Sequence, residues 1–243
     1  MVSIAYLGAS SSAVNPLMKQ GVRMAEQGRK AALKVLVFGA SLREESLNRK
    51  LAALAARVAA ESGAEIDHAS MREFDVPSYD GDVDKEQGLP NGAEQFRRRI
   101  SESDAFIVSS PEYNGSMPGM FKNLIDWTSR SRPQPFDGKH GLLMSASPSM
   151  VGGNRGLWAL RMPFEHLGAR IYPDMFSLAQ SHKALVDGDI ADATLRARFD
   201  KNIQAFLSLA EAAKHYPCMK RAWVEFLGEP PEAGVDREDP VPA

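Results

Sequence analysis

The sequence predicts an α/β fold in which a doubly wound, five-stranded parallel sheet carries helices on both faces. Short apolar runs alternate along the chain with longer segments whose apolar residues recur at helical spacing, the order expected of right-handed β-α-β units. Hydrophobic residues make up 44% of the 243 residues and charged residues 25%, which supplies enough apolar side chains to cover both faces of a sheet.

The first strand is predicted at residues 34–38, a run too short for a helix and too uniformly apolar for a strand with one wet face. A helix ending before Gly63 follows it. Its apolar residues recur at helical spacing: Leu47, Leu51, Leu54 and Val58. A weaker strand is expected at 65–71, and the polar stretch 76–91, marked by Pro and Gly, is expected to be a long surface loop.

A short helix is predicted at 93–103 and a buried strand at 105–109. Pro118 then suits the first turn of a helix. One face of that helix is apolar or small: Met117, Phe121, Leu124, Ile125 and Thr128. The remaining predicted elements continue the alternation: a strand at 141–146, a helix at 154–167 closed by Gly168, a strand at 170–178 broken by Pro173, and a helix at 193–215.

The predicted domain occupies residues 33–216. Residues 1–32 mix Ser, Gly, Ala, Lys and Arg without a sustained period and are predicted to be an N-terminal extension. Residues 217–243 combine several prolines with acids and are predicted to be a C-terminal tail without regular structure.

Composition argues against several classes of protein. The formal net charge of -2 leaves no basic field to attract nucleic acid. Cys218 is the only cysteine and the histidines show no HxxxH or HxH spacing, so neither a disulfide nor a metal site is predicted. No run approaches the ~20 apolar residues of a membrane helix, and the first residues do not look like a secretory signal. We therefore expect a cytoplasmic protein without membrane partners.

Ligands of open α/β sheets bind beyond the carboxyl ends of the strands, so the loops at 39–48, 109–118 and 145–155 are expected to lie together. The first loop matches neither GxGxxG nor a P-loop, which argues against a dinucleotide fold and a nucleotide hydrolase. Its hydroxyls, guanidinium, amide and helix N-terminus suit a phosphate monoester. The candidate ligands are Ser41, Arg43, Ser46 and Asn48. Alternatively, Ser46 only caps the helix and Arg43 is a surface charge.

The second loop, at 109–118, is dense in Pro, Gly, Asn and Tyr, which predicts a sharply turned segment able to lie against a flat heteroaromatic ring and hydrogen-bond its edge. An ordinary turn into a helix would explain Gly115 and Pro118 but gives no reason for Glu112, Tyr113 and Asn114 together. In the third loop the glycines permit close approach of the backbone to a ligand.

The segments GASLREESLN and SSPEYNGSMPGMFKNLIDW resemble the NADPH-dependent FMN reductase family, which includes quinone, azo and chromate reductases on a flavodoxin-like fold. The resemblance covers roughly residues 33–215 and implies FMN and NADPH as cofactors. By this resemblance the FMN phosphate is held by Ser41, Arg43, Ser46 and Asn48. The isoalloxazine is lined by Pro111, Glu112, Tyr113 and Asn114, with Ser147 and Gly153 added from the third loop.

The implied activity is reduction of a small acceptor, such as a quinone, an azo compound or chromate, with hydride from NADPH or NADH. Because flavin N5 accepts the hydride, no catalytic side chain is required, and both substrates are expected to use one flavin face in a ping-pong cycle. The alternatives are a flavin reductase that releases reduced FMN and a non-enzymatic flavodoxin-like electron carrier or sensor. The resemblance also implies a homodimer or homotetramer, with the helix after Pro118 as a contact.

Overall fold

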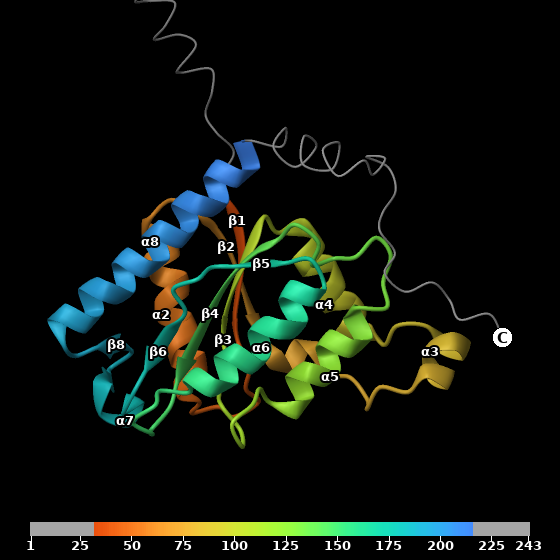
Figure 1. Cartoon of the computed structure of the whole chain (residues 1–243), viewed down its shortest axis with the longest axis horizontal. Coiled ribbons are helices and arrows are strands. Elements are labelled where there is room, and N and C mark those ends of the chain that lie inside the picture. The colour runs from red at the N-terminus through yellow and green to blue at the C-terminus, as the bar shows by residue number, and fades with distance from the viewer. Residues whose placement is uncertain (1–31, 216–243) are drawn as a thin grey trace, which may run out of the picture. The chain divides into compact units, whose positions relative to one another are not determined.

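A parallel β-sheet forms the middle layer of the domain (Figure 1). The computed structural model describes residues 32–215, so the predicted tail and all but the last residue of the predicted extension lie outside the described residues. The strand order is β2-β1-β3-β4-β5, and β6 also pairs with β4. The strands are β1 (Lys34–Gly39), β2 (Glu65–Ser70), β3 (Ala105–Ser109), β4 (His140–Ala146), β5 (Arg170–Ile171) and β6 (Phe176–Leu178). The doubly wound parallel sheet is confirmed.

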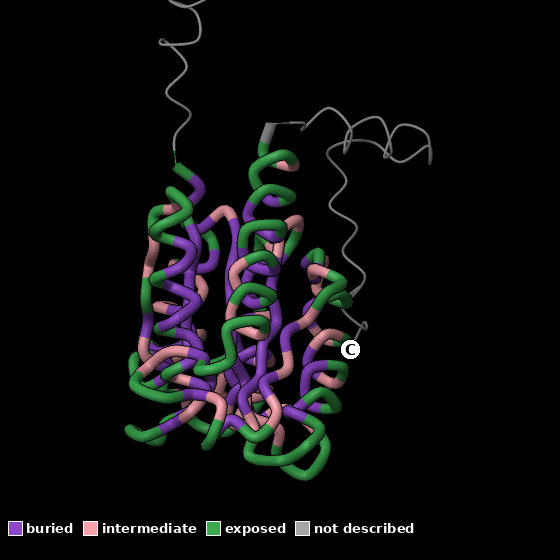
Figure 2. Tube along the Cα trace, turned by 90° about the vertical axis from the view of Figure 1, so that its left-hand side faces the viewer, coloured by how far each residue is buried: buried purple, intermediate pink, exposed green. Residues whose placement is uncertain are grey.

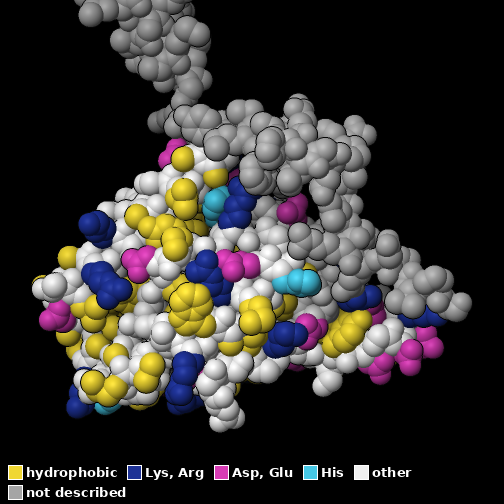
Figure 3. Space-filling model, in the orientation of Figure 1, with side chains coloured by type: hydrophobic (Ala, Val, Ile, Leu, Met, Phe, Trp, Pro, Cys, Tyr) yellow, Lys and Arg dark blue, Asp and Glu magenta, His cyan; other side chains and the backbone are white. Residues whose placement is uncertain are grey.

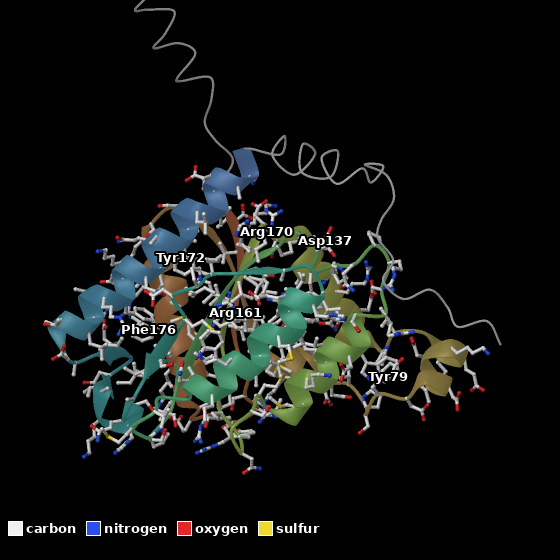
Figure 4. All side chains as sticks on the ribbon, viewed as in Figure 1. Tyr79, Asp137, Arg161, Arg170, Tyr172 and Phe176 are labelled. Carbon is white, nitrogen blue, oxygen red and sulfur yellow. The ribbon has the colours of Figure 1, made fainter. Side chains whose placement is uncertain are left out.

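The fifth strand position is filled by two short strands instead of one. β5 pairs with the beginning of β4 and β6 with its end, which confirms the prediction of a strand at 170–178 broken by Pro173. Pro173 has no N–H to donate to the ladder, which accounts for the break. On either side of it, Tyr172 lies 5.9 Å from the ring of Phe206, and Phe176 lies 5.0 Å from the ring of Phe199, both on α8 (Figure 4).

Helices cover both faces of the sheet, and the sheet is buried between them (Figure 2). Along β1, Val35 and Val37 join one hydrophobic cluster, whereas Leu36 and Phe38 join the other, which explains the uniformly apolar sequence. The first cluster includes α2 (Leu47–Glu61) and α8 (Ala193–His215), and the second includes α4 (Asn91–Glu102), α5 (Gly119–Thr128) and α6 (Asn154–His166).

Several short elements were not predicted. The expected loop at 76–91 contains α3 (Gly81–Gln87), which has no buried residue and therefore no apolar period to reveal it. Its capping residue is Asp80, whose carboxylate accepts the N–H of Asp82 at 2.9 Å. The other unpredicted elements are a 3-10 helix at Met71–Phe74, α7 (Ser181–Ala184) and a hairpin of β7 (Leu185–Val186) and β8 (Asp189–Ile190).

Trp127 anchors the segment before α3 to α5. The side chain is fully buried, and its indole N–H donates to the carbonyl of Pro77 at 2.9 Å. The ring of Tyr79 packs edge-on against it at 4.9 Å, on the α3 side of the molecule in Figure 4. Asn123 adds two hydrogen bonds to the same segment, accepting from the N–H of Tyr79 and donating to Pro77. The segment is thus fixed where sequence alone predicted only a loop.

Candidate active site

The three predicted loops meet beyond the carboxyl ends of β1, β3 and β4, toward the bottom of Figure 1. The N–H of Ala40 donates to the carbonyl of Ser109 at 2.9 Å, which joins the first loop to the end of β3. The N–H of Ser110 donates to the carbonyl of Met144 at 2.8 Å, which joins the second loop to β4. The expectation that these loops lie together is confirmed by these contacts.

Asn48 connects all three loops through one buried amide. Its Nδ2 donates to the carbonyl of Ala146 at 2.9 Å, and its Oδ1 accepts the N–H of Ala146 and the hydroxyl of Ser109, each at 2.9 Å. Since β3 ends at Ser109, opposite Met144, the Asn48 amide serves Ala146 as the next stretch of strand backbone would. The side chain therefore bonds to protein groups instead of lying free beside a phosphate.

The first loop keeps other groups that suit a phosphate. Ser41 and Ser46 are buried, and Ser46 caps α2 by accepting the N–H of Arg49 at 3.4 Å. The N–H groups of Leu47 and Asn48, in the first turn of α2, have no intrahelical acceptor and carry the positive end of the helix dipole. Arg43 is exposed, as the alternative reading also expected. Capping and phosphate binding are compatible, because the Ser46 hydroxyl hydrogen is still available.

Gly39 allows α2 to approach the end of β1. A Cβ at this position would lie 2.8 Å from Arg49 Cα and 2.9 Å from the Asn48 carbonyl oxygen, both on the backbone of α2. The guanidinium of Arg49 in turn donates to the carbonyl of Arg43 at 3.3 Å. Glycine at position 39 therefore allows the start of α2 to lie against the end of β1.

The second loop contains a tight turn at Asn114 and Gly115, whose φ angles are 52° and 77°. Tyr113 and Ser116 exchange backbone hydrogen bonds of 2.9 and 3.0 Å across it, the arrangement of a type I′ turn. The sharp turn expected from the sequence is present. One consequence is that the N–H of Tyr113 already has an acceptor, whereas its side chain is exposed.

The carboxylate of Glu112 lies against α6. Oε2 accepts the N–H of Gly156 at 3.0 Å, and Oε1 lies 3.2 Å from the guanidinium of Arg155. The Glu112 side chain is only 12% exposed, whereas that of Arg155 is 69% exposed. Glu112 was expected to line the isoalloxazine, but its side chain is bonded to α6.

The third loop leads into α6 through Gly153, a left-handed residue with φ 83° that caps the helix. A Cβ there would collide with the hydroxyl of Ser145, so only glycine fits. Ser147 lies on the side of β6, where its N–H donates to the carbonyl of Leu178 at 3.1 Å and its hydroxyl accepts the N–H of Ser149 at 3.2 Å. The structure places Gly153 beside the second loop and Ser147 near the start of the third loop, beside β6.

A hollow of about 390 Å³ is lined by residues of α2 and β2 and by Gly39 and Glu44 of the first loop. Two of its charged side chains have protein partners: Lys50 lies 2.6 Å from Glu45, and Glu73 lies 2.7 Å from Arg99. We assign it no ligand. Within residues 32–215, no three His, Cys, Asp or Glu side chains are grouped so that they could hold a metal ion.

Gly156 is a site residue that sequence reasoning missed. A Cβ on it would lie 3.0 Å from Glu112 Cβ and 3.1 Å from the Ser116 carbonyl, so α6 packs directly on the second loop. An isolated glycine within a helical pattern was the available signal.

The fold and the three loops define a flavodoxin-like protein. A solved flavoenzyme, the NAD(P)H:acceptor oxidoreductase FerB of Paracoccus denitrificans, matches with a TM-score of 0.64 and 27% identity, covering 75% of this chain and 99% of that one. The family is shown more directly by sequence: the family model described as NADPH-dependent FMN reductase matches residues 33–183. The chain belongs to the NADPH-dependent FMN reductase family.

Two curated relatives agree with this assignment. A quinone reductase of Escherichia coli K12 is 37% identical over 139 residues, which span 57% of this chain and 73% of that protein. An NAD(P)H-dependent FMN reductase of Pseudomonas aeruginosa is 33% identical over 176 residues, which span 71% of this chain and 92% of the relative.

Proposed function

We propose that this protein binds FMN and uses it to pass electrons from NADPH or NADH to a small acceptor of the quinone type. The observation that carries the proposal is the meeting of the three loops at one edge of the sheet, with buried hydroxyls and a helix N-terminus in the first and a tight turn in the second. Bound FMN would supply a hydride-accepting N5, so the chain itself needs only to bind and orient.

At the phosphate end, we assign binding to the hydroxyls of Ser41 and Ser46 and to the first-turn N–H groups of α2. These hydroxyl and N–H groups carry no formal charge, but the positive ends of their dipoles suit a dianionic phosphate. Arg43 is exposed and would supply charge from solvent. Asn48 takes part through its backbone N–H, while its side chain holds the loops together.

At the ring end, we assign binding to the backbone of residues 111–114, with Gly153 and Ser147 at the outer side. Because the N–H of Tyr113 is used within the turn, the N–H groups of Glu112 and Asn114 are the donors proposed for the polar edge of the ring. Their dipoles would stabilise negative charge on the reduced ring.

The side chains around this edge favour a neutral, flat acceptor. Each of the three loops presents at least one large exposed hydrophobic residue, namely Leu42, Tyr113, Met150 and Val151. Burying a quinone or an azo compound against these hydrophobic side chains is favourable, whereas a charged chromate ion would lose hydration there without finding a partner. We expect kcat/KM for an uncharged benzoquinone to exceed that for chromate. A faster reaction with chromate would contradict this assignment.

A second copy of the chain is the proposed partner of α6. Trp158 and Met162, one helical turn apart, are 57% and 72% exposed, and hydrophobic side chains lie at the surface over this helix (Figure 3). Trp127, on α5, belongs to the core instead. We expect a homodimer or homotetramer in sedimentation velocity, and we expect Trp158→Glu to shift it toward monomer. An unchanged sedimentation coefficient would exclude α6 as the contact.

None of the helices within residues 32–215 combines the length and apolar character needed to cross a membrane. We propose a cytoplasmic location, with support from the single cysteine, which suits a reducing compartment. We further propose that residues 33–216 form the reductase domain, with residues 1–32 and 217–243 as extensions.

The decisive experiment is the visible spectrum of the purified protein before and after anaerobic addition of NADPH. Flavin bands at about 370 and 450 nm that bleach on addition are expected, because the cofactor itself reports the hydride transfer. Parallel lines in two-substrate kinetics would then agree with alternating use of one site. A stable semiquinone without reduction by NADPH would favour an electron carrier, and failure to bind added FMN would end the proposal.

A further inference from the structure

We infer that Glu112 is a positioning residue whose carboxylate holds the second loop against the first turn of α6, and that this contact shapes the ring end of the FMN site. The inference rests on the proposed function. It gives the Glu112 side chain a role on α6 instead of a contact with the flavin.

The contact is short and largely shielded from water. Glu112 Oε2 accepts the N–H of Gly156 at 3.0 Å, and the Glu112 side chain is 12% exposed. Gly156 lies in the first turn of α6, where its N–H has no acceptor within the helix. A carboxylate at this position satisfies an orphan donor and faces the positive end of the helix dipole.

The close approach of Gly156 to the second loop makes the contact specific for this pair of residues. The Cα of Gly156 approaches so closely that an added Cβ would lie 3.0 Å from Glu112 Cβ, 3.1 Å from Glu112 Cα and 3.1 Å from the Ser116 carbonyl. A bulkier residue would therefore move the loop away from the helix. Arg155 contributes less, because its side chain is 69% exposed and solvent screens such a pair.

The position of Glu112 in the loop explains why this contact matters to a ligand. Glu112 directly precedes Tyr113, where the type I′ turn begins, so a single carboxylate fixes the near side of that turn. Without it the backbone of 111–114 would sample positions away from α6. Apparent affinity for the ring would fall in proportion to the fraction of time the loop is in place.

The test compares Glu112→Gln, Glu112→Ala and Gly156→Ala with the wild type. Glutamine keeps an oxygen that can accept the Gly156 N–H, whereas alanine removes it. FMN affinity is measured by quenching of flavin fluorescence, and hydrogen exchange of the unliganded proteins reports on peptides containing residues 111–116 and 153–160. Glu94→Gln is the matched control, since Glu94 pairs with Arg97 on the surface of α4.

We expect Glu112→Ala to weaken FMN about tenfold, the factor carried by one hydrogen bond of ordinary strength. Glu112→Gln should stay within about threefold of wild type, and Gly156→Ala should resemble Glu112→Ala, because its methyl group displaces the loop. In both disruptive variants exchange should rise in the two named peptides and not in the β1 and β3 peptides, which also verifies folding. Glu94→Gln should change nothing.

Equal losses of FMN affinity in Glu112→Gln and Glu112→Ala would instead indicate that the Glu112 charge contacts the ligand directly, and would overturn the inference. Unchanged exchange at 153–160 in Glu112→Ala would overturn it as well. If the wild type binds no FMN, the proposed function fails. Hydrogen exchange in the unliganded chain then decides whether Glu112 holds the loop. Glu112 holds the loop only if Glu112→Ala loses protection in both peptides.

Discussion

Replacing Asn48 with alanine removes three buried hydrogen bonds at once, and the cost can be worked out from their partners. The substitution leaves the N–H and the carbonyl of Ala146 without their partner at the end of β4, each previously bonded at 2.9 Å. An unsatisfied buried polar group costs about 1–3 kcal/mol, so the two together cost about 2–6 kcal/mol. The Ser109 hydroxyl can rotate toward another acceptor and adds less. That sum is a large share of the ~5–15 kcal/mol by which typical domains are stable.

Urea unfolding of the unliganded protein, followed by far-UV circular dichroism, measures this loss in the free energy of unfolding. Ser109→Ala is the matched control, because it removes one bond to Asn48 Oδ1 and leaves both Ala146 groups paired. Its expected cost is about 0.5–1.5 kcal/mol. If Asn48→Ala costs no more than Ser109→Ala, Asn48 is not the connection between the loops that its contacts indicate.

Further predictions concern the close approach of α2 and the pH dependence of stability. Gly39→Ala should lower the free energy of unfolding by about 1–3 kcal/mol in urea or thermal unfolding, because the added Cβ meets the Arg49 backbone at 2.8 Å. Gly119→Ala is the control and should not lower it, because open space surrounds Gly119. Burial raises the pKa of the Asp104 carboxyl, but hydrogen bonds from Lys214 and a backbone N–H outweigh burial and hold that pKa below its usual 3.8. A lowered folded-state pKa gives stability that is present above the unfolded value and lost as pH falls, so Asp104→Asn should destabilise most at pH ~7 and least near pH ~2. A difference independent of pH would refute that linkage.

The strands could be predicted where both of their faces are covered. At 34–38 and 105–109 every side chain but the first lysine is buried, so the sequence is uniformly apolar and the pattern has one interpretation. The short helix α3 has no buried side chain and left no such pattern. The β7–β8 hairpin, with two residues in each strand, was too short for any periodicity.

The meeting of the three loops could also be predicted, because it follows from the geometry of a parallel sheet. The directions of individual side chains could not. Asn48 bonds to a residue 98 positions away and Glu112 to one 44 positions away, so each outcome depends on which backbone atoms the fold brings within reach. The same residue types would equally suit a phosphate or a flavin edge, and only the packed structure separates these roles.

The position of β2 at the edge of the sheet bears on how the protein avoids aggregation. An edge strand offers unpaired backbone groups to any other extended chain. Along β2 the side chains of Glu65, Asp67 and His68 are polar or charged, and Arg99 holds the carboxylate of Asp67 in an ion pair beside the strand. A strand added from another molecule would have to desolvate these groups. The opposite edge is formed by β5 and β6, with two and three residues, and such short strands offer little backbone for another chain to pair with.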